Sequence, residues 1–498
     1  MEQPTLDNIR VCEGVKLKDK KIKIECRTDI PFENVGKTLD LTVFVSSDNA
    51  KAENGQVTLN GKATFNLIYF NDGLKKTEIE KEFTEVFEDE NLSNGQLVKF
   101  SVKVEKTGID GDSFVTLYCY AEISGEANCK KTLSCYLAEE DVVVNTSDME
   151  YLKGYGEKSF DYPIEEEFDL SYPVGEVLAH TGKVIVNAVQ CGVGSILVDG
   201  ELFFSALFLQ NDEKSDIIKV EKSFPFRAET EYEESMPSMT AISKANLRAL
   251  NSDVIVDPES GKSIVKASAV INFLSEAFSE EVATVVSDAF SVKNHSEGVV
   301  EECSFDLPEC SKTYKFKVSG RVNADLSDGL DILAVSGENV EIVSSEIEDD
   351  KLKISGVLKL KGFARDGEGN YIALSLETAF SEELDFDLTC GDKFCVSAIA
   401  TRGGIRPVSY TEAEIGADLI LFIKSVKKGK IKYLKDLVLS GEKTAVDSAI
   451  SVYIAKKDED LWSLSKRLNV TPNELSVTNP ELSFPLTGKE RIIIFRGK

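Results

Sequence analysis

Residues 196–212 read Ile196-Leu-Val-Asp-Gly200-Glu-Leu-Phe-Phe-Ser-Ala-Leu-Phe-Leu-Gln-Asn-Asp212. Apolar residues stand two apart on either side of a glycine, and the stretch ends in polar residues typical of a turn. Positions 202, 204, 206 and 208 would form one face of a strand that is buried on one side. The stretch therefore predicts a long β-strand with a glycine inside it.

The same pattern occurs twice more in the chain. Val57–Asp72 carries Gly61, and Leu352–Gly369 carries Gly356, each at the same place in the pattern as Gly200. A glycine inside a strand often marks a bulge or a bend. Because the glycine falls at one position of the pattern three times, an internal repeat explains it better than chance alternation.

A second alternating segment follows each copy, at Ser113–Ser124, Ser263–Ser275 and Ala413–Ser425. The serines that end these segments lie 151 and 150 residues apart, so both segments recur in the same order. The sequence thus predicts a mainly β protein of three tandem, sandwich-like repeats. We expect their boundaries at residues 1–150, 151–296 and 297–446.

The charge of the chain narrows the classes of partner. It has 57 Lys and Arg against 86 Asp and Glu, a net charge of -29. A field of this sign repels phosphate backbones and anionic lipid headgroups, so we expect neither nucleic-acid binding nor a polybasic membrane anchor. Hydrophobic residues make up 42% of the chain, which is enough for folded domains despite the charge.

Residues 1–10 lack a basic patch followed by an apolar core, so we expect no secretory signal peptide and a cytoplasmic protein. The longest apolar runs, such as 418–423 and 491–495, have the length of strands, and no membrane insertion is expected.

The ten cysteines lie mostly alone in strand-like stretches, which favours reduced thiols. Their spacings differ from those of zinc ligands, so the sequence predicts no metal site and no cofactor.

Catalytic motifs are also missing from the sequence. The only histidines, His180 and His295, stand in no signature of a nucleophile and its base. Ser260–Ser263 is similar to the end of a phosphate-binding loop but lacks its first glycine, and a hairpin turn explains it better. Arg402–Pro407 is basic and glycine-rich; it would either hold a carboxylate of a partner or form a loop between strands. We therefore expect a protein that is not an enzyme.

From about residue 447 the pattern changes to strand, helix, helix, strand. Ser451–Ala455 predicts a short strand, and leucines at helical spacing around Trp462 predict a first helix. Thr471 as N-cap, with Pro472 and Glu474 after it, predicts a second helix. Arg491–Phe495 supplies a closing strand.

The segment 447–498 resembles a LysM domain in its Leu461-Trp462 dipeptide, its Asn479-Pro480 and its Gly488-Lys489 before an isoleucine-rich strand. The resemblance implies a groove for N-acetylglucosamine-containing glycans between two loops. The loop residues that it implies as a ligand or partner site are Asp458, Glu459, Asp460, Leu461, Asn479, Pro480 and Glu481. The residues that it implies as the core of the domain are Trp462, Leu464, Leu468 and Ile493.

The first of these loops departs from the LysM pattern. Asp458-Glu459-Asp460 stands where LysM domains usually have Gly-Asp-Thr or Gly-Asp-Ser. The glycine that would permit a positive φ is missing. Three carboxylates there would favour the positive end of the first helix, and they would make a glycan groove more charged than usual.

The glycine-containing repeats ahead of one LysM-like domain are similar to the SPOCS-type domains of the SipL group of sporulation proteins from spore-forming Firmicutes. This resemblance implies a mother-cell protein at the forespore surface. It would act as a scaffold of spore-coat assembly and bind a coat ATPase like stage IV sporulation protein A. The alternative is a LysM-mediated binder of peptidoglycan or other N-acetylglucosamine-containing glycan. A wall hydrolase with a LysM anchor is disfavoured by the missing catalytic motifs.

Overall fold

The computed structural model describes residues 8–137, 139, 141–170, 173–210, 216–256, 262–326, 330–348, 351–385, 393–444 and 450–495. Long antiparallel strands dominate these residues, which confirms the prediction of a mainly β protein. Of the described helices, none is long and apolar enough to cross a membrane. Between residues 8 and 442, the ladders of the described strands fall into three groups, called here the first, second and third β units.

The first β unit spans residues 8–134 and has two sheets. One sheet has the order β1-β8-β7-β4, with β2 paired to β8 as well, and the other has the order β3-β5-β6. The strands are β1 (Asn8–Lys16), β2 (Lys20–Pro31), β3 (Lys37–Ser47), β4 (Ala50–Lys51), β5 (Gln56–Phe70), β6 (Leu74–Glu88), β7 (Leu97–Asp110) and β8 (Phe114–Ser134), with a 3-10 turn at Phe32–Asn34.

The second β unit, residues 142–291, pairs β13-β14-β9 in one sheet and β10-β11-β12 in the other. Its strands are β9 (Val142–Leu170), β10 (Val174–Cys191), β11 (Ser195–Gln210), β12 (Ile217–Glu231), β13 (Thr240–Val256) and β14 (Ser263–Ser291). Alternate residues of both sheets share one core, which includes Phe204 of β11 and Phe273 of β14. This is the packing that two-residue periodicity predicts for a sheet with one buried face.

The third β unit, residues 294–442, pairs β15-β20-β19 and β16-β17-β18. Its strands are β15 (Asn294–Asn323), β16 (Asp331–Glu348), β17 (Lys351–Arg365), β18 (Tyr371–Asp385), β19 (Lys393–Ser409) and β20 (Glu412–Glu442). Residues 402–407, considered as a loop, lie inside β19. Arg402 is 3.4 Å from Asp418 of the neighbouring strand, so its carboxylate partner is within the unit.

The boundaries expected after residues 150 and 296 fall inside β9 and β15. The alternating pattern of each strand continues across these positions, so the sequence pattern does not indicate a boundary there. The strand ladders instead leave gaps between residues 134 and 142 and between 291 and 294.

The repeated glycine lies opposite a phenylalanine of the neighbouring strand in each β unit. The pairs are Gly61 with Phe83, Gly200 with Phe226, and Gly356 with Phe380. A Cβ at the three glycines would come within 2.3, 2.5 and 2.6 Å of the respective rings. Each ring therefore covers the glycine backbone, and only a residue without a side chain leaves room for it. The expected bulge is not in the glycine strand itself.

One sheet of each unit contributes to a shared apolar centre. In β3, β10 and β16 the ladder skips one residue at the same place, and the skipped residues are Leu39, Leu178 and Leu333. These leucines pack together with Ile68, Leu207 and Phe363, which stand seven residues after the three repeated glycines. The bulge turns each leucine toward the centre, so the three units are joined by corresponding residues.

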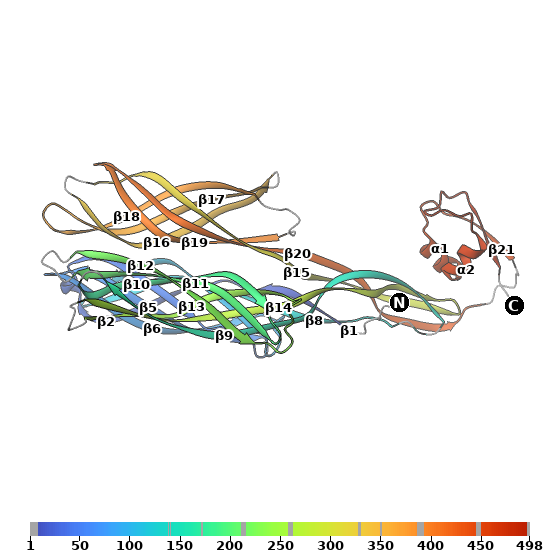
Figure 1. Cartoon of the computed structure of the whole chain (residues 1–498). Coiled ribbons are helices and arrows are strands. Elements are labelled where there is room, and N and C mark those ends of the chain that lie inside the picture. Colours follow the sequence, from blue (N-terminus) through green and yellow to red (C-terminus); the bar gives the residue numbers. More distant parts are fainter. Residues whose placement is uncertain are drawn as a thin grey trace.

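Beyond the sandwiches, three two-stranded ribbons run on together, as Figure 1 shows for β1, β8, β14, β15 and β20. We call this part the stalk; it pairs residues 8–16 with 126–134, 142–153 with 279–291, and 294–308 with 426–442. Its core contains Ile9, Met149 and Phe305, one from each unit. The segment 450–495 lies at the far end of the stalk (Figure 1).

Replacing Gly200 by alanine should lower the free energy of unfolding by about 1–3 kcal/mol, because the new Cβ would also meet the Ile185 carbonyl at 2.3 Å. Urea unfolding of the full chain measures the change. Gly337→Ala is the matched control, since open space surrounds a Cβ at that strand position. Equal effects of the two substitutions would contradict the role given to the glycine–phenylalanine pair.

Candidate partner-binding site

The segment 450–495 contains β21 (Ile450–Ile454), α1 (Leu461–Leu468), α2 (Pro472–Thr478) and β22 (Arg491–Phe495). Its core includes Leu464, Leu468, Leu475 and Ile492. The two strands form an antiparallel ribbon, and the two short helices follow one another between them in the chain.

Both helices begin at side-chain caps. Asp460 accepts a hydrogen bond from the Ser463 amide, and Thr471 and Glu474 form a capping box at the start of α2. The first helix ends at Asn469, which has a left-handed backbone. These caps satisfy amides that a helix leaves unpaired, so the local sequence fixes where each helix starts.

The loop before α1 is made without the expected glycine. Asp458 takes a φ of 62°, and its amide donates to the Leu486 carbonyl at 2.8 Å. Aspartate tolerates this left-handed conformation better than most residues. The departure from the LysM pattern at this position therefore does not remove the turn.

Glu459 is 9% exposed and binds Arg467 of α1 through both carboxylate oxygens, at 2.7 and 2.8 Å. The Lys456 amide also donates to it. The hydrogen bonds from Arg467 hold the pKa of Glu459 below its usual range. This carboxylate stabilises the segment and is not free for a ligand.

Asn479 is the corresponding residue of the second loop. Its amide nitrogen donates to the Ile493 carbonyl at 2.8 Å, and its oxygen accepts from the Ile493 amide at 2.7 Å. It is 2% exposed and joins the end of α2 to β22 by these hydrogen bonds.

The remaining loop residues that were expected to bind a ligand differ in exposure. Leu461 is partly buried, whereas Asp458, Pro480 and Glu481 are exposed.

Two residues expected in the core of the segment lie elsewhere. Ile493 is 37% exposed because Ile492 and Ile494, on either side of it in β22, face the helices. Trp462 packs against Phe290 of β14 at 5.2 Å between ring centroids, and not in the core of its own segment. A run of three isoleucines does not reveal which face is buried, and periodicity does not show contacts with a distant strand.

Asp288 of the stalk holds the segment in place. Its carboxylate accepts hydrogen bonds from the Trp462 indole at 2.8 Å and from Lys466 at 2.7 and 2.8 Å. Lys443 adds a second link, since it donates to the Ser291 carbonyl and to the Asn469 side chain. These contacts direct the side of α1 that carries Trp462 toward the stalk.

The face of the β21–β22 ribbon that points away from the core of the segment is an exposed apolar surface, here called the ribbon face. It consists of Ile450, Val452, Ile454, Ile493 and Phe495, which are 57%, 59%, 59%, 37% and 63% exposed. Contiguous apolar surface of this kind marks sites of protein association. Sequence reasoning missed it, although apolar residues at successive positions of Arg491–Phe495 indicate a strand with two apolar faces.

The features considered for catalysis have structural partners. Ser252 lies 3.0 Å from Nδ1 of His180, and burial lowers the pKa of that histidine. Residues 260 and 261 of the Ser260–Ser263 motif lie outside the described residues, and Ser263 bonds to the backbone of Val174. Within the described part of the chain, no group of three His, Cys, Asp or Glu residues could hold a metal ion.

The SipL, SPOCS domain family matches residues 173–255, which run from β10 into β13 of the second β unit. This part of the second β unit is thus similar to a SPOCS domain. No curated protein and no solved structure matches it.

The substitution Glu459→Gln should lower the stability of the segment by about 1–3 kcal/mol at pH 7, because Arg467 loses its ionic partner. Because the native pKa of Glu459 is depressed, its contribution is present above the unfolded pKa of about 4.3 and is lost as the pH falls through the lower native value. Thermal unfolding followed by Trp462 fluorescence between pH 7 and pH 3 measures this. Glu481→Gln, on an exposed residue, should change little; an equal loss there would contradict the assignment.

The substitution Asp288→Asn should release Trp462 from the stalk, because Lys466 loses its counter-ion and the indole keeps at best a weaker acceptor. We expect a red-shifted emission of this only tryptophan, and a smaller shift when salt is added to the wild type. Glu280→Gln, on an exposed residue of the same strand, is the control. An unshifted spectrum in Asp288→Asn would show that the contact does not hold the segment.

Proposed function

We propose that this chain is a non-enzymatic scaffold of spore-coat morphogenesis. In this role it binds a coat-basement ATPase like stage IV sporulation protein A at the forespore surface, in the mother-cell cytoplasm. The match to the SipL, SPOCS domain supports a protein-interaction role in sporulation. The ribbon face, with five exposed apolar side chains, is the observation that carries the assignment of the binding site.

The chemistry of the segment favours a protein over a glycan as its ligand. Sugars are recognised largely by polar groups that are free to hydrogen-bond, but Glu459, Asp460 and Asn479 already bond within the segment. An exposed patch of aliphatic and aromatic side chains instead resembles the apolar centre of a protein interface. Around it, residues 450–495 carry six basic and six acidic residues, so the segment lacks the repulsive charge of the whole chain.

The contacts of His180 and of the first loop of the segment support a role without catalysis. The Ser252–His180 pair joins two strands of the second β unit, and burial lowers the proton affinity of the imidazole. The side chains of the first loop of the segment serve as a cap and as an ion-pair partner. A binding role requires neither a nucleophile nor a bound cofactor.

The test compares three forms of the full chain for binding to the purified ATPase and to chitin oligomers. Val452→Glu puts a charge in the middle of the ribbon face and should weaken ATPase binding at least tenfold, or by about 1.4 kcal/mol. Val477→Glu, on a 73% exposed residue of α2, is the matched control and should bind like the wild type. Surface plasmon resonance measures both ligands.

Two results would contradict the proposal. Saturable binding of chitin oligomers without binding of the ATPase would make the chain a glycan-binding protein. Equal ATPase affinity of wild type and Val452→Glu would move the binding site away from the ribbon face. Unfolding curves of the two variants confirm that any loss of binding is not a loss of structure.

A further inference from the structure

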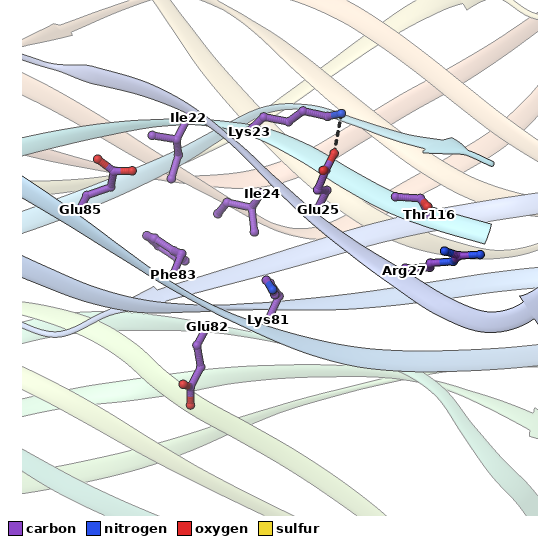
Figure 2. A pocket seen from close by; sticks show the side chains of 10 residues that line it. All are labelled: Ile22, Lys23, Ile24, Glu25, Arg27, Lys81, Glu82, Phe83, Glu85 and Thr116. Carbon is purple, nitrogen blue, oxygen red and sulfur yellow. Dashed lines mark ion pairs between the residues drawn. The ribbon is translucent and has the colours of Figure 1, made fainter. Parts of the chain in front are cut away.

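A cleft of about 500 Å³ opens between the two sheets of the first β unit. Figure 2 shows it between β2 and β6, with Ile22, Ile24 and Phe83 inside and charged side chains around them. The volume is in the range of sites that hold a few side chains of a ligand. Phe83 is the ring that covers the repeated glycine of this unit.

The corresponding place is filled in the other two units. Ala121, Ile271 and Leu421 are fully buried residues at corresponding places of the three units, and their ladder partners are Ile22, Tyr162 and Tyr314. In the second unit, Tyr162 lies 6.0 Å from Phe226, the ring that covers the glycine there. The first unit has the smaller Ile22 where its sister units have a tyrosine.

The third unit closes the same edge with two aromatic residues. Phe316 lies 6.5 Å from Phe380, and the Tyr314 hydroxyl donates to the Asp385 carbonyl at 3.0 Å, across to β18. The residue that corresponds to Phe316 in the first unit is Ile24, as their ladder partners show. The first unit thus lacks both rings and the bond between the sheets.

Both strands beside the cleft are at the edge of their sheets. Among the described strands, β2 pairs with β8 alone and β6 pairs with β5 alone. Each therefore has one row of backbone amides and carbonyls without a partner strand, which can bind an extended chain. The open edge and the apolar cleft lie together.

The charged side chains that line the cleft are the basic Lys23, Arg27 and Lys81 and the acidic Glu25, Glu82 and Glu85. Lys23 is paired with Glu25 at 2.7 Å, and Lys20 is paired with Glu85 at 3.2 Å. Arg27 and Lys81, from opposite strands, are exposed, and no carboxylate among the described residues lies within ion-pair distance of either. Arg27 is held over the ring of Phe114 at 5.0 Å. These two cations can bind a carboxylate beside the cleft.

We propose that this cleft binds an extended peptide segment of a partner protein, with an aromatic side chain inserted against Ile22 and Phe83 and an acidic residue next to it. The aromatic group occupies the space that tyrosine fills in the sister units, and the acidic residue pairs with Arg27 or Lys81. The peptide backbone adds a strand at the open edge. The site is separate from the ribbon face, which lies at the other end of the molecule (Figure 1), so it does not depend on the proposed function.

The probe is a fluorescein-labelled peptide with the sequence of residues 158–165, Lys-Ser-Phe-Asp-Tyr-Pro-Ile-Glu, which contains the tyrosine of the second unit and an adjacent aspartate. Fluorescence anisotropy with the full chain should show saturable binding. The same peptide with alanine for its tyrosine should bind about tenfold more weakly, because it loses the aromatic contact. Residues 312–319, which have tyrosine but lysines around it, should also bind more weakly.

The variant Ile22→Tyr fills the cleft as the sister units do and should weaken binding of the first peptide at least tenfold while unfolding at an unchanged or higher urea concentration. Val193→Tyr, at an 80% exposed position of the second unit, is the matched control. If Ile22→Tyr fails to fold, Arg27→Glu with Lys81→Glu gives a second test, since both residues are exposed and binding should fall. No saturation below about 1 mM, or equal binding by wild type and these variants, would overturn the proposal.

Discussion

The apolar centre formed by Leu39, Leu178 and Leu333 holds the three β units in one body. Each leucine is the extra residue of a bulge, so its side chain leaves the alternation of its strand and meets the other two. The stalk depends on this arrangement. Its three ribbons are continuations of strands from the three sandwiches, and they pack around Ile9, Met149 and Phe305 only where the sandwiches bring them together.

The apolar centre uses corresponding residues of the three units, so it does not specify which unit meets which. Buried ion pairs between particular units provide that distinction. Glu338 of the third unit lies between Lys183 and Lys219 of the second, and Lys99 of the first unit binds Glu276 of the second. Removing one partner of such a pair leaves a buried charge, which is costly, whereas the intact pair adds little net stability. Their effect is therefore mainly on which surfaces of the three similar units can meet.

The stalk also determines how the C-terminal segment is presented. Asp288 fixes the Trp462 side of α1, and the ribbon face is left at the outside. A tethered domain would have to lose rotational freedom on binding a partner, but a docked one has lost it already. The same logic applies at the first β unit, where two edge strands of a rigid sandwich flank a preformed cleft, and side chains do not have to move apart to admit a ligand.

The strands and the caps of both helices could be predicted from the sequence, because alternation and capping depend on residues within a few positions of one another. Of the residues expected in the core of the C-terminal segment, Leu464 and Leu468 lie in it, whereas Trp462 and Ile493 do not. Three features became visible only in the folded chain: Glu459 forms an ion pair with Arg467, Trp462 contacts Asp288, and Ile22 lines a cleft at a place where the other two units have a tyrosine. The contact of Trp462 with Asp288 and the cleft at Ile22 depend on residues far apart in the chain. In all three features, the packing of the folded chain and not the local sequence pattern determines which side chains remain free.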